Sequence, residues 1–481
     1  GQPLFKNNCT LICNGEIYNW KELIRLSNSP CNTGSDCEII IDLYKKYGIN
    51  ETLQLLDGVF AFVLVDHTDK KMFVARDAIG IRPLFMWYNN IYLDTILFSS
   101  ELKMGTGLLK PRMQPQPFPP GHYMTMQYNN YGYNCQRLIP FFTPSTFANN
   151  AIRYIKDTDR LIRETLIAAV RKRVDNTDRE IACLLSGGLD SSLITSLVVK
   201  EFQKKHGPDG NKMVNTWSIG FEGSEDLKYA KKVADFLGTT HHEIKCTEES
   251  FLAAIPEVIY AIESYDTTTV RASVGNYLIC KYIKEQSDAK VIFNGDGSDE
   301  LTGGYLYFHY APGSVEFDIE CRRLLKDLHL FDVLRSDRSI SSHGLEPRTP
   351  FLDRGFVKSY LSIPAHLRNH VIHGQQEKFL LRHAFSKGGF LPEEVLYRQK
   401  EAFSDGVSTQ KESWFEVIQR HAAKMYKELT PKVAEQEYYK KIFTSHFGDC
   451  DYNKHVMPYR WMPRFIDATD ASARTLPIYK K

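Results

Sequence analysis

The feature that most constrains the fold of this chain is a loop rich in glycine and serine, Ser186-Gly187-Gly188-Leu189-Asp190-Ser191-Ser192. The residues before it, 181–185, form an apolar run with the length of a buried strand. After it, apolar side chains recur at helical spacing over 193–198. We therefore predict that the loop is a turn that joins a buried strand to a helix.

Such a turn is suited to binding an anion. Its free backbone N–H groups and the positive end of the helix dipole converge on one point, and Ser186, Ser191 and Ser192 add hydroxyl donors. The loop lacks the Gly-Lys-Ser/Thr ending of a Walker A motif and carries the carboxylate of Asp190 instead. A carboxylate beside phosphates repels them unless a cation such as Mg²⁺ bridges the two. We predict a pyrophosphate site; the alternative is an ordinary turn that caps a helix.

Composition places the chain among soluble globular proteins. It has 481 residues, enough for two or three domains, with 43% hydrophobic and 25% charged residues. The net charge of +2 gives no reason to expect nucleic acid or an acidic membrane as a partner. No apolar run approaches the length of a membrane span, and the first twenty residues show no signal peptide. We therefore expect a cytoplasmic protein without nucleic-acid or membrane partners.

The ten cysteines do not form a disulfide framework, because they are scattered along the chain. Four of them, Cys9, Cys13, Cys31 and Cys37, lie close enough in sequence for zinc to be weighed. Their spacing includes no C-x2-C pair, so buried apolar thiols are the better interpretation.

The first third of the chain is rich in strand patterns. A strand at 11–13 is expected to end in a turn at 14–16, and a hairpin is expected over 59–75. Between 105 and 120, five prolines exclude a helix or a central strand, which predicts a stiff crossing between domains. We expect an α+β domain of antiparallel sheets over 1–125, followed by a linker over 126–150.

The remainder, 151–481, alternates between strand and helix patterns before it becomes largely helical. This order is typical of a doubly wound parallel α/β sheet, here with extra helices, which binds its ligands at the carboxyl ends of the strands. The turns after Leu185, Ile219 and Phe293 would then lie on one edge of the sheet. The predicted elements are helix 158–174, strand 214–219, helix 226–237, strand 241–246, helices 251–264 and 271–285, and strand 290–293.

The charged residues of that edge indicate a chemistry. Asp190 and Asp299 are suited to hold Mg²⁺ against a triphosphate, and Lys400 could balance the charge of the α-phosphate. Taken alone, Asp299 is equally well explained as an acid at a helix start, and Lys400 is better explained as a solvated surface lysine. A loop that holds the pyrophosphate implies attack at the α-phosphorus, which is adenylation of an acid to an acyl-AMP.

The combination of motifs resembles the glutamine-dependent asparagine synthetases. The Gly/Ser loop is shared by all synthetases with a pyrophosphate loop, whereas the other matching segments are more specific, and the tail over 461–475 is similar to the eukaryotic type. The resemblance runs almost from end to end. The specific segments are Tyr265-Asp266-Thr267-Thr268-Thr269-Val270-Arg271-Ala272-Ser273, Gly295 to Tyr305, Glu346 to Asp353, and Lys400 to Gly406.

The resemblance implies a ligase with two parts. The N-terminal part would be a class II glutamine amidotransferase of the N-terminal-nucleophile type. The C-terminal part would use ATP and Mg²⁺ to convert aspartate to β-aspartyl-AMP, which ammonia then turns into asparagine. A homodimer is also implied, with aspartate, ATP and glutamine or ammonia as the small-molecule substrates.

The resemblance also assigns roles to residues by motif. Asp296 and Lys400 are the catalytic candidates, and Asp190 and Asp299 are the metal ligands. The binding candidates are Leu184, Ile219, Asn294 and Gly295 for adenosine; Ser186, Gly187, Gly188, Asp190, Ser191 and Ser192 for pyrophosphate; Thr268, Thr269 and Arg271 for aspartate; and Asn14, Gly15, Glu16 and Asp36 for glutamine.

Two departures from the family pattern bear on activity. Asp296 stands where the family has a glutamate tied to formation of the aspartyl-AMP, so we expect an active but slow synthetase. The family's nucleophilic cysteine is the first residue of its mature chain, whereas this chain starts with Gly1. We expect that an N-terminal part is missing, since the glutamine-binding residues remain; the alternative is an enzyme that uses free ammonia.

Two rival functions stay open from the sequence. One is a β-lactam synthetase or another amidotransferase with a different acid acceptor, against which the Asp-Thr-Thr-Thr-Val-Arg stretch speaks. The other is a non-catalytic homologue that binds a nucleotide or a partner protein. In that case Asp190, Asp299 and Lys400 would be charges without a task.

Overall fold

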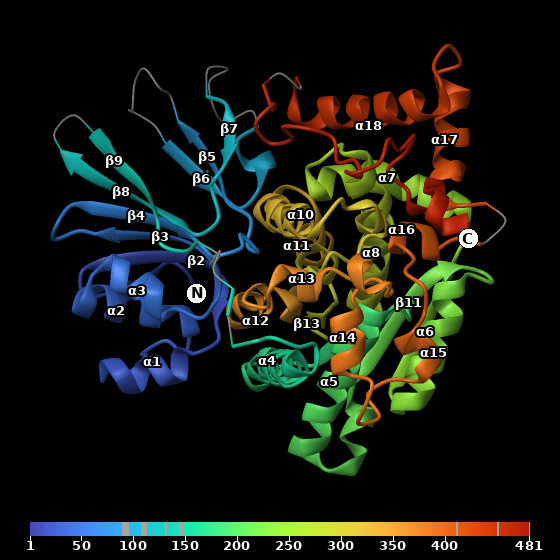
Figure 1. The fold of residues 1–481 in the computed structure, drawn as a ribbon. Coiled ribbons are helices and arrows are strands. Elements are labelled where there is room, and N and C mark those ends of the chain that lie inside the picture. Colours follow the sequence, from blue (N-terminus) through green and yellow to red (C-terminus); the bar gives the residue numbers. More distant parts are fainter. Residues whose placement is uncertain are drawn as a thin grey trace. The chain divides into compact units, whose positions relative to one another are not determined.

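The computed structural model describes residues 1–88, 96–106, 113–129, 132–143, 148–149, 151–409, 412–449 and 452–480. The chain forms two compact units (Figure 1). The first unit comprises residues 1–144 and 447–458, and the second comprises 145–446 and 459–481. Among the described residues, no helix is long and apolar enough to cross a membrane.

The first unit is built on a six-stranded antiparallel sheet in the order β1-β2-β3-β4-β8-β9. Alternate residues of β2 and β3, among them Leu11, Cys13, Phe60 and Phe62, pack into one core with the helix α2. The predicted antiparallel α+β unit is confirmed. The strands are β1 Leu4–Lys6, β2 Cys9–Ile17, β3 Gly58–Asp66, β4 Lys71–Arg76, β8 His122–Asn129 and β9 Gly132–Pro140, and the helices are α1 Trp20–Ser27, α2 Ile39–Tyr47 and α3 Ile49–Leu55.

In two local stretches of this unit, the observed structure differs from the prediction. The expected turn at 14–16 is part of β2, where Asn14 pairs with Ala61 and Gly15 pairs with Phe60. A Cβ on Gly15 would lie 2.2 Å from the carbonyl oxygen of Val59, so the glycine permits close strand pairing here and makes no turn.

The Pro-rich stretch does not cross between the units over its described part. Residues 115–117 form β7, an edge strand of a three-stranded sheet in the order β6-β5-β7, with β5 at Phe85–Tyr88 and β6 at Ile96–Ser99. An edge position tolerates proline because the missing N–H has no ladder partner there. The stretch around Pro111 lies outside the described residues. Part of the predicted linker, 126–150, likewise belongs to β8 and β9.

The second unit contains a five-stranded sheet in the order β12-β11-β10-β13-β14, with every pair parallel. The central strands β10 and β13 are short, apolar and largely buried, as strands covered by helices on both faces must be. The predicted doubly wound fold is confirmed. Its elements are α4 Lys156–Asp175, β10 Ile181–Leu184, α5 Leu189–His206, β11 Asn215–Phe221, α6 Glu225–Leu237, β12 Thr240–Cys246, α7 Glu248–Ile262, α8 Thr267–Gln286, β13 Val291–Phe293 and β14 Glu346–Arg348.

Helices follow the strands in the rest of the second unit, as the sequence predicts. Beyond α18, residues 459–480 form a tail with two short 3-10 turns, and Trp461 and Leu476 of this tail pack into a core with Phe308 and Phe317. The helices are α9 Ser298–Thr302, α10 Ser314–Asp327, α11 Asp332–Ser341, α12 Arg354–Leu361, α13 Ala365–Arg368, α14 Phe379–Ala384, α15 Glu393–Leu396, α16 Phe403–Gly406, α17 Trp414–Met425 and α18 Pro431–Phe447.

Candidate active site

The Gly/Ser loop is the turn that the sequence predicts. Strand β10 ends at Leu184, and the long helix α5 starts at Leu189, so the first N–H groups of α5 point out of the turn. Gly187 has φ of +71°, and a Cβ there would lie 2.4 Å from the backbone nitrogen of Ala230 in α6. Glycine is required at this point because the loop turns against the next helix.

The loop's hydroxyls hold its shape. The Oγ atoms of Ser186 and Ser191 lie 3.0 Å apart, and the N–H of Ser186 donates to Ser191 Oγ at 3.2 Å. Ser186, Gly188 and Ser191 line a pocket at this edge of the sheet, whereas Gly187 and Ser192 do not. Ser192 is fully buried.

A second turn packs directly against this loop. It follows β13 and runs from Asn294 to Gly297, where α9 begins. A Cβ on Gly295 would lie 2.8 Å from both the Cβ of Asp190 and the backbone nitrogen of Ser191. The turns after β10 and β13 therefore meet at the carboxyl edge of the sheet, where α/β folds bind their ligands.

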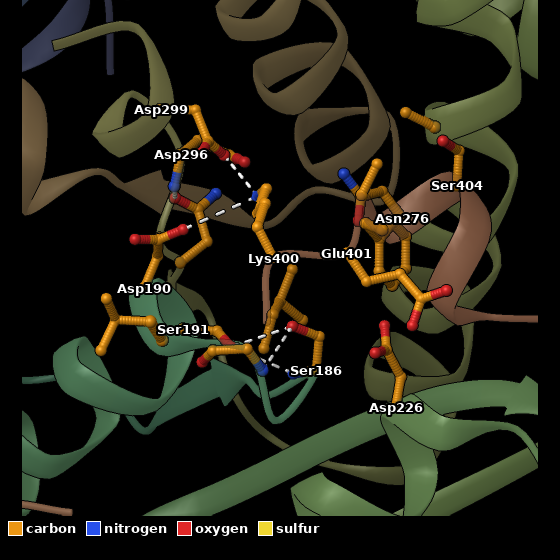
Figure 2. A pocket seen from close by; sticks show the side chains of 18 of the residues that line it. Ser186, Asp190, Ser191, Asp226, Asn276, Asp296, Asp299, Lys400, Glu401 and Ser404 are labelled. Carbon is orange, nitrogen blue, oxygen red and sulfur yellow. Dashed lines mark hydrogen bonds and ion pairs between the residues drawn. The ribbon is translucent and has the colours of Figure 1, made fainter. Parts of the chain in front are cut away.

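The pocket gathers most of the residues that the sequence singles out for the synthetase reaction (Figure 2). Ile219 of β11 and Thr268 of α8 complete it from neighbouring elements. The side chain of Thr268 has a buried hydroxyl with no hydrogen-bond partner in the described part of the chain. The predicted residues that line the pocket are Leu184, Ser186, Gly188, Asp190, Ser191, Ile219, Thr268, Asn294, Gly295, Asp296, Asp299 and Lys400.

Asp190 and Asp299 face the same space. An ammonium that the sequence analysis did not identify, that of Lys378, lies between them, at 2.5 Å from Asp190 Oδ2 and 2.6 Å from Asp299 Oδ1. Lys400 Nζ lies 2.6 Å from Asp299 Oδ2 and 4.0 Å from Asp190 Oδ2 (Figure 2). Two carboxylates from separate turns thus share two lysines.

These pairs set the ionisation of the site. Burial alone would raise the pKa of Asp299, but the charges and hydrogen bonds of Lys378 and Lys400 outweigh it and hold that pKa well below its usual range. Burial also disfavours the charged form of Lys400, yet the attraction of Asp299 and Asp190 raises its pKa above the ordinary value. Asp299 therefore stays ionised and Lys400 stays protonated at neutral pH.

Asp296 lies in the same pocket but has different partners. It accepts a hydrogen bond from Ser336 Oγ at 2.5 Å, and Arg335 Nη2 lies 3.9 Å from its Oδ1. Burial raises the pKa of Asp296, and the attraction of Arg335 opposes that rise. Asp296 is thus a carboxylate whose proton affinity exceeds that of an exposed aspartate.

The loop that carries Lys400 is held from two sides. On one side, Arg398 donates to Asp226 at 2.8 Å. On the other, Arg474 of the C-terminal tail donates to Glu401 Oε1 at 2.5 Å and to the carbonyl oxygen of Asp405 at 2.9 Å. Residues on either side of Lys400 therefore have fixed partners, which keeps its ammonium at the carboxylates.

Arg271 does not reach this pocket, contrary to the role predicted for it. Its guanidinium donates to both oxygens of Glu435 at 2.7 and 2.6 Å, and to both oxygens of Asp470 at 2.6 and 3.0 Å. Thr269 is also engaged, because it donates to the helix-capping Asp266 at 2.8 Å. With Nε, Nη1 and Nη2 already bound to carboxylates, Arg271 anchors the C-terminal tail instead of facing a substrate.

The residues predicted to bind glutamine lie in the first unit. Asn14, Gly15 and Glu16 are consecutive in β2, and Asp36 opens the turn before α2. The carboxylate of Asp36 accepts the N–H of Ile17 at 2.5 Å, which places it beside the end of β2. The structure thus brings these four residues into one neighbourhood.

The carboxylate oxygens of the pocket determine whether it suits Mg²⁺. No group of three or more His, Cys, Asp and Glu side chains is arranged for a metal within the described residues. Asp190 Oδ1, however, is buried and has no hydrogen-bond partner in that same part of the chain. Mg²⁺ is usually held by one or two carboxylates together with substrate phosphates, so the paired carboxylates of Asp190 and Asp299 fit that ion.

Sequence reasoning missed several cations that line the pocket, among them Lys378 and Arg335. Arg335 donates to Asp332 at 2.9 and 2.7 Å. Neither residue belongs to a glycine-rich turn. The available signal for Lys378 was its place directly before the apolar Phe379, Leu380 and Leu381, because a lysine is rarely buried unless its charge is paired.

Comparisons with known proteins bear on both units. The sequence model of the family described as "Asparagine synthase" matches residues 161–319 and 311–464, and that of the "Glutamine amidotransferase domain" matches 1–105. The chain is 43% identical to the asparagine synthetase (glutamine-hydrolysing) of Mesocricetus auratus, 42% to that of Homo sapiens and 41% to that of Gallus gallus. Each match covers 98% of this chain and 86% of the relative.

Proposed function

This chain belongs to the glutamine-hydrolysing asparagine synthetases, and from that premise we propose that the pocket of its second unit is where ATP and aspartate react. The protein is a ligase that makes asparagine from aspartate at the expense of ATP, with nitrogen drawn from glutamine. The observation that carries the proposal is the sharing of two lysines by Asp190 and Asp299.

We assign the two halves of the reaction to the two units. The predicted amidotransferase region, 1–125, supplies most of the strands of the first unit, and Asn14, Gly15, Glu16 and Asp36 are the proposed glutamine ligands there. The predicted synthetase region, 151–481, supplies the pocket. The cytoplasmic location and the homodimer stay predictions from the sequence.

ATP is proposed to bind along the edge of the parallel sheet. The N–H groups at the start of α5 and the hydroxyls of Ser186 and Ser191 would hold the pyrophosphate end. Leu184, Ile219 and Gly295 would line the adenosine pocket together with Asn294, whose amide donates to Ser336 Oγ at 2.9 Å. This orientation leaves the α-phosphate near Lys400.

Asp190 and Asp299 are the residues that would hold Mg²⁺. When bound, the ion supplies positive charge that lets carboxylates and phosphates share one site. The buried and unpartnered Oδ1 of Asp190 supports this assignment. The chain's own contribution is to keep Asp299 ionised, because Lys378 and Lys400 hold its pKa well below the usual range.

The chemical step is attack on the α-phosphorus by the β-carboxylate of aspartate. A P–O bond forms to the carboxylate, the bond between the α-phosphorus and the bridging oxygen breaks, and pyrophosphate leaves with the electron pair. Lys400 is proposed to stabilise the charge that gathers on the α-phosphate oxygens. Ammonia then attacks the acyl carbon and AMP leaves. Asp296, with its raised pKa, is our candidate to accept the proton that the nitrogen loses.

Substrate aspartate requires a partner for its carboxylate other than Arg271. Arg335 lines the pocket and retains donors beyond those bound to Asp332. A guanidinium is the natural bidentate partner of a carboxylate. We assign Arg335 and the unpartnered hydroxyl of Thr268 to the aspartate end.

The proposed reaction is tested by measuring its products. The chain is incubated with ATP, Mg²⁺, aspartate and ammonia, and AMP, pyrophosphate and asparagine are quantified. We expect the three in equal amounts; ADP would contradict attack at the α-phosphorus. Lys400→Ala should slow the reaction by about 100- to 1,000-fold. The control is Lys172→Ala, which removes a lysine that pairs with Asp353 at 2.8 Å, away from the pocket lining. A second arm with glutamine in place of ammonia tests nitrogen supply by the first unit.

A further inference from the structure

Lys378 is the most deeply buried cation of the pocket, and the proposed mechanism gives it no task. Only 1% of its side chain is exposed, compared with 17% for Lys400. Its ammonium lies between one oxygen of Asp190 and one oxygen of Asp299, so these two oxygens are at most about 5 Å apart. A metal ion bound by both carboxylates would have to lie at the same point as this ammonium.

The surroundings of Lys378 are shaped for a lysine. A Cβ on Gly304 would lie 2.0 Å from Lys378 Cε and 2.4 Å from Asp299 Oδ1, so the stem passes where only a glycine leaves room. Lys378 itself has φ of +60°, in the left-handed region that residues other than glycine seldom adopt. Such a conformation persists only where the surrounding structure imposes it, and it is concentrated at functional sites.

The neighbouring residues fix that conformation. Arg382, one turn along α14, donates to the carboxylate of Glu377 at 2.6 Å and to its backbone carbonyl at 2.9 Å. These contacts hold the peptide before Lys378 in place. The ammonium can therefore change partners only by rotation about the bonds of its own side chain.

We propose that Lys378 is the resident counter-ion of Asp190 and Asp299, and that its ammonium passes from these carboxylates to the pyrophosphate end of ATP when the nucleotide enters with its metal. This inference rests on the proposed function of the two carboxylates as metal ligands. Without a cation between them, the two buried charges would repel each other. With Lys378 in place, the ligand-free site is already neutralised, and a divalent cation has little reason to enter without ATP.

The consequence is an order of binding that can be measured. In the unaltered protein, metal binds together with the nucleotide, because the triphosphate attracts the ammonium away from the carboxylates. If the ammonium is removed, the two carboxylates should accept a divalent cation in the absence of nucleotide. Pyrophosphate, in contrast, should lose a partner.

The variant to make is Lys378→Met, which keeps most of the unbranched stem and removes the charge. Mn²⁺ is the probe, and its binding to the full chain without nucleotide is followed by electron paramagnetic resonance of the free ion. We expect Lys378→Met to bind Mn²⁺ at least tenfold more tightly than the unaltered protein and inorganic pyrophosphate at least tenfold more weakly. The melting temperature of the variant should rise on addition of Mn²⁺, whereas that of the unaltered protein should stay nearly constant.

The matched control is Lys172→Met, which also removes a lysine from a buried aspartate but away from the pocket lining. Its Mn²⁺ affinity should equal that of the unaltered protein. If Lys378→Met does not fold, Lys378→Gln serves instead, because it also removes the charge and keeps an unbranched, polar side chain. It should shift both affinities in the same directions.

Two results would separately contradict the inference about Lys378 and the proposed metal site. If Lys378→Met binds Mn²⁺ and pyrophosphate as the unaltered protein does, while Asp190→Asn weakens binding of Mn²⁺ with ATP, then the inference about Lys378 is wrong and the metal site stands. If Asp190→Asn and Asp299→Asn both leave binding of Mn²⁺ with ATP unchanged, the proposed role of the carboxylates fails as well.

Discussion

Two buried clusters of charge in the second unit use the same chemistry for different ends. In the phosphate cluster (Asp190, Asp299, Lys378 and Lys400), each aspartate and Lys400 keep about one sixth of the side chain exposed, and Asp190 has an oxygen without a hydrogen-bond partner in the described chain. In the anchor cluster (Arg271, Glu435 and Asp470), exposure is 8% or less and one guanidinium binds four carboxylate oxygens.

The two clusters differ in the groups that remain available to bind a ligand. The phosphate cluster pairs flexible lysines with carboxylates and opens on a pocket, so its partners can be exchanged for phosphates and a metal. The anchor cluster fixes a planar fork against two carboxylates, and further donors from Gln419 reach the same acids. A charged residue in a family motif can therefore bind a substrate or hold the fold, and its partners decide which.

The largest effect is expected where the anchor cluster is broken. Arg271→Met leaves Glu435 and Asp470 buried without their cation, which should cost about 3–5 kcal/mol of stability. The measurement is urea unfolding of the variant beside the unaltered chain. The folded fraction should keep its KM for aspartate. A raised KM at unchanged stability would instead support the role that the sequence predicts for Arg271.

A smaller effect is expected in the phosphate cluster's pocket, at Asp296. Asp296→Glu restores the longer carboxylate of the family pattern and should raise the ammonia-dependent rate by about 10- to 100-fold, because misplacement of a reacting group by about 1 Å costs that much. Steady-state rates of asparagine formation measure the change. Ser336→Ala, which removes the hydrogen bond at 2.5 Å to Asp296, should lower the rate. A slower Asp296→Glu enzyme would show that the pocket has adapted to the shorter side chain.

The smallest effect concerns Asp405, which contacts the anchor cluster through Ser472. Ser472, which donates its N–H to Asp470, also donates its hydroxyl to Asp405 at 3.0 and 3.1 Å. Burial raises the pKa of Asp405 to about 6, although Arg474 opposes the rise. Asp405 therefore contributes stability that is fully present below its unfolded pKa, near 4, and is lost as pH rises through about 6.

This shift predicts a pH dependence that Asp405→Asn should remove. Between pH 5 and 7.5, the unaltered chain should lose about 1–2 kcal/mol of unfolding free energy relative to Asp405→Asn. Urea unfolding of both proteins across that range gives the difference directly. Parallel pH curves would mean that Asp405 is ionised in the folded protein throughout.

Local pattern was sufficient to predict much of the second unit. The apolar run 181–185, the helical spacing over 193–198 and Gly238 after α6 each specify an element through short-range chemistry, and strands and helices form there. The parallel order then brings the turns that carry Asp190 and Asp299 to one edge. The rule that parallel strands end at a common edge does not depend on distant residues, and this is why the prediction succeeds.

The remaining features depend on partners far away in the sequence. Lys378 is 188 residues from Asp190, and Arg271 is 164 and 199 residues from its two acids. Nothing local to Arg271 distinguishes an anchor from a substrate ligand. The course of β2 through Asn14 and Gly15 likewise depends on pairing with β3, which overrides the turn preference of an Asn-Gly pair.

The most direct test of the account is whether Asp190 and Asp299 act on one ligand. Binding of Mn²⁺ together with ATP is measured for Asp190→Asn, Asp299→Asn and, as the anchor-cluster control, Asp470→Asn. We predict that the first two variants each weaken this binding at least tenfold, and that folded Asp470→Asn binds as the unaltered chain does. Weakening by one of the two pocket variants without the other would contradict a shared site.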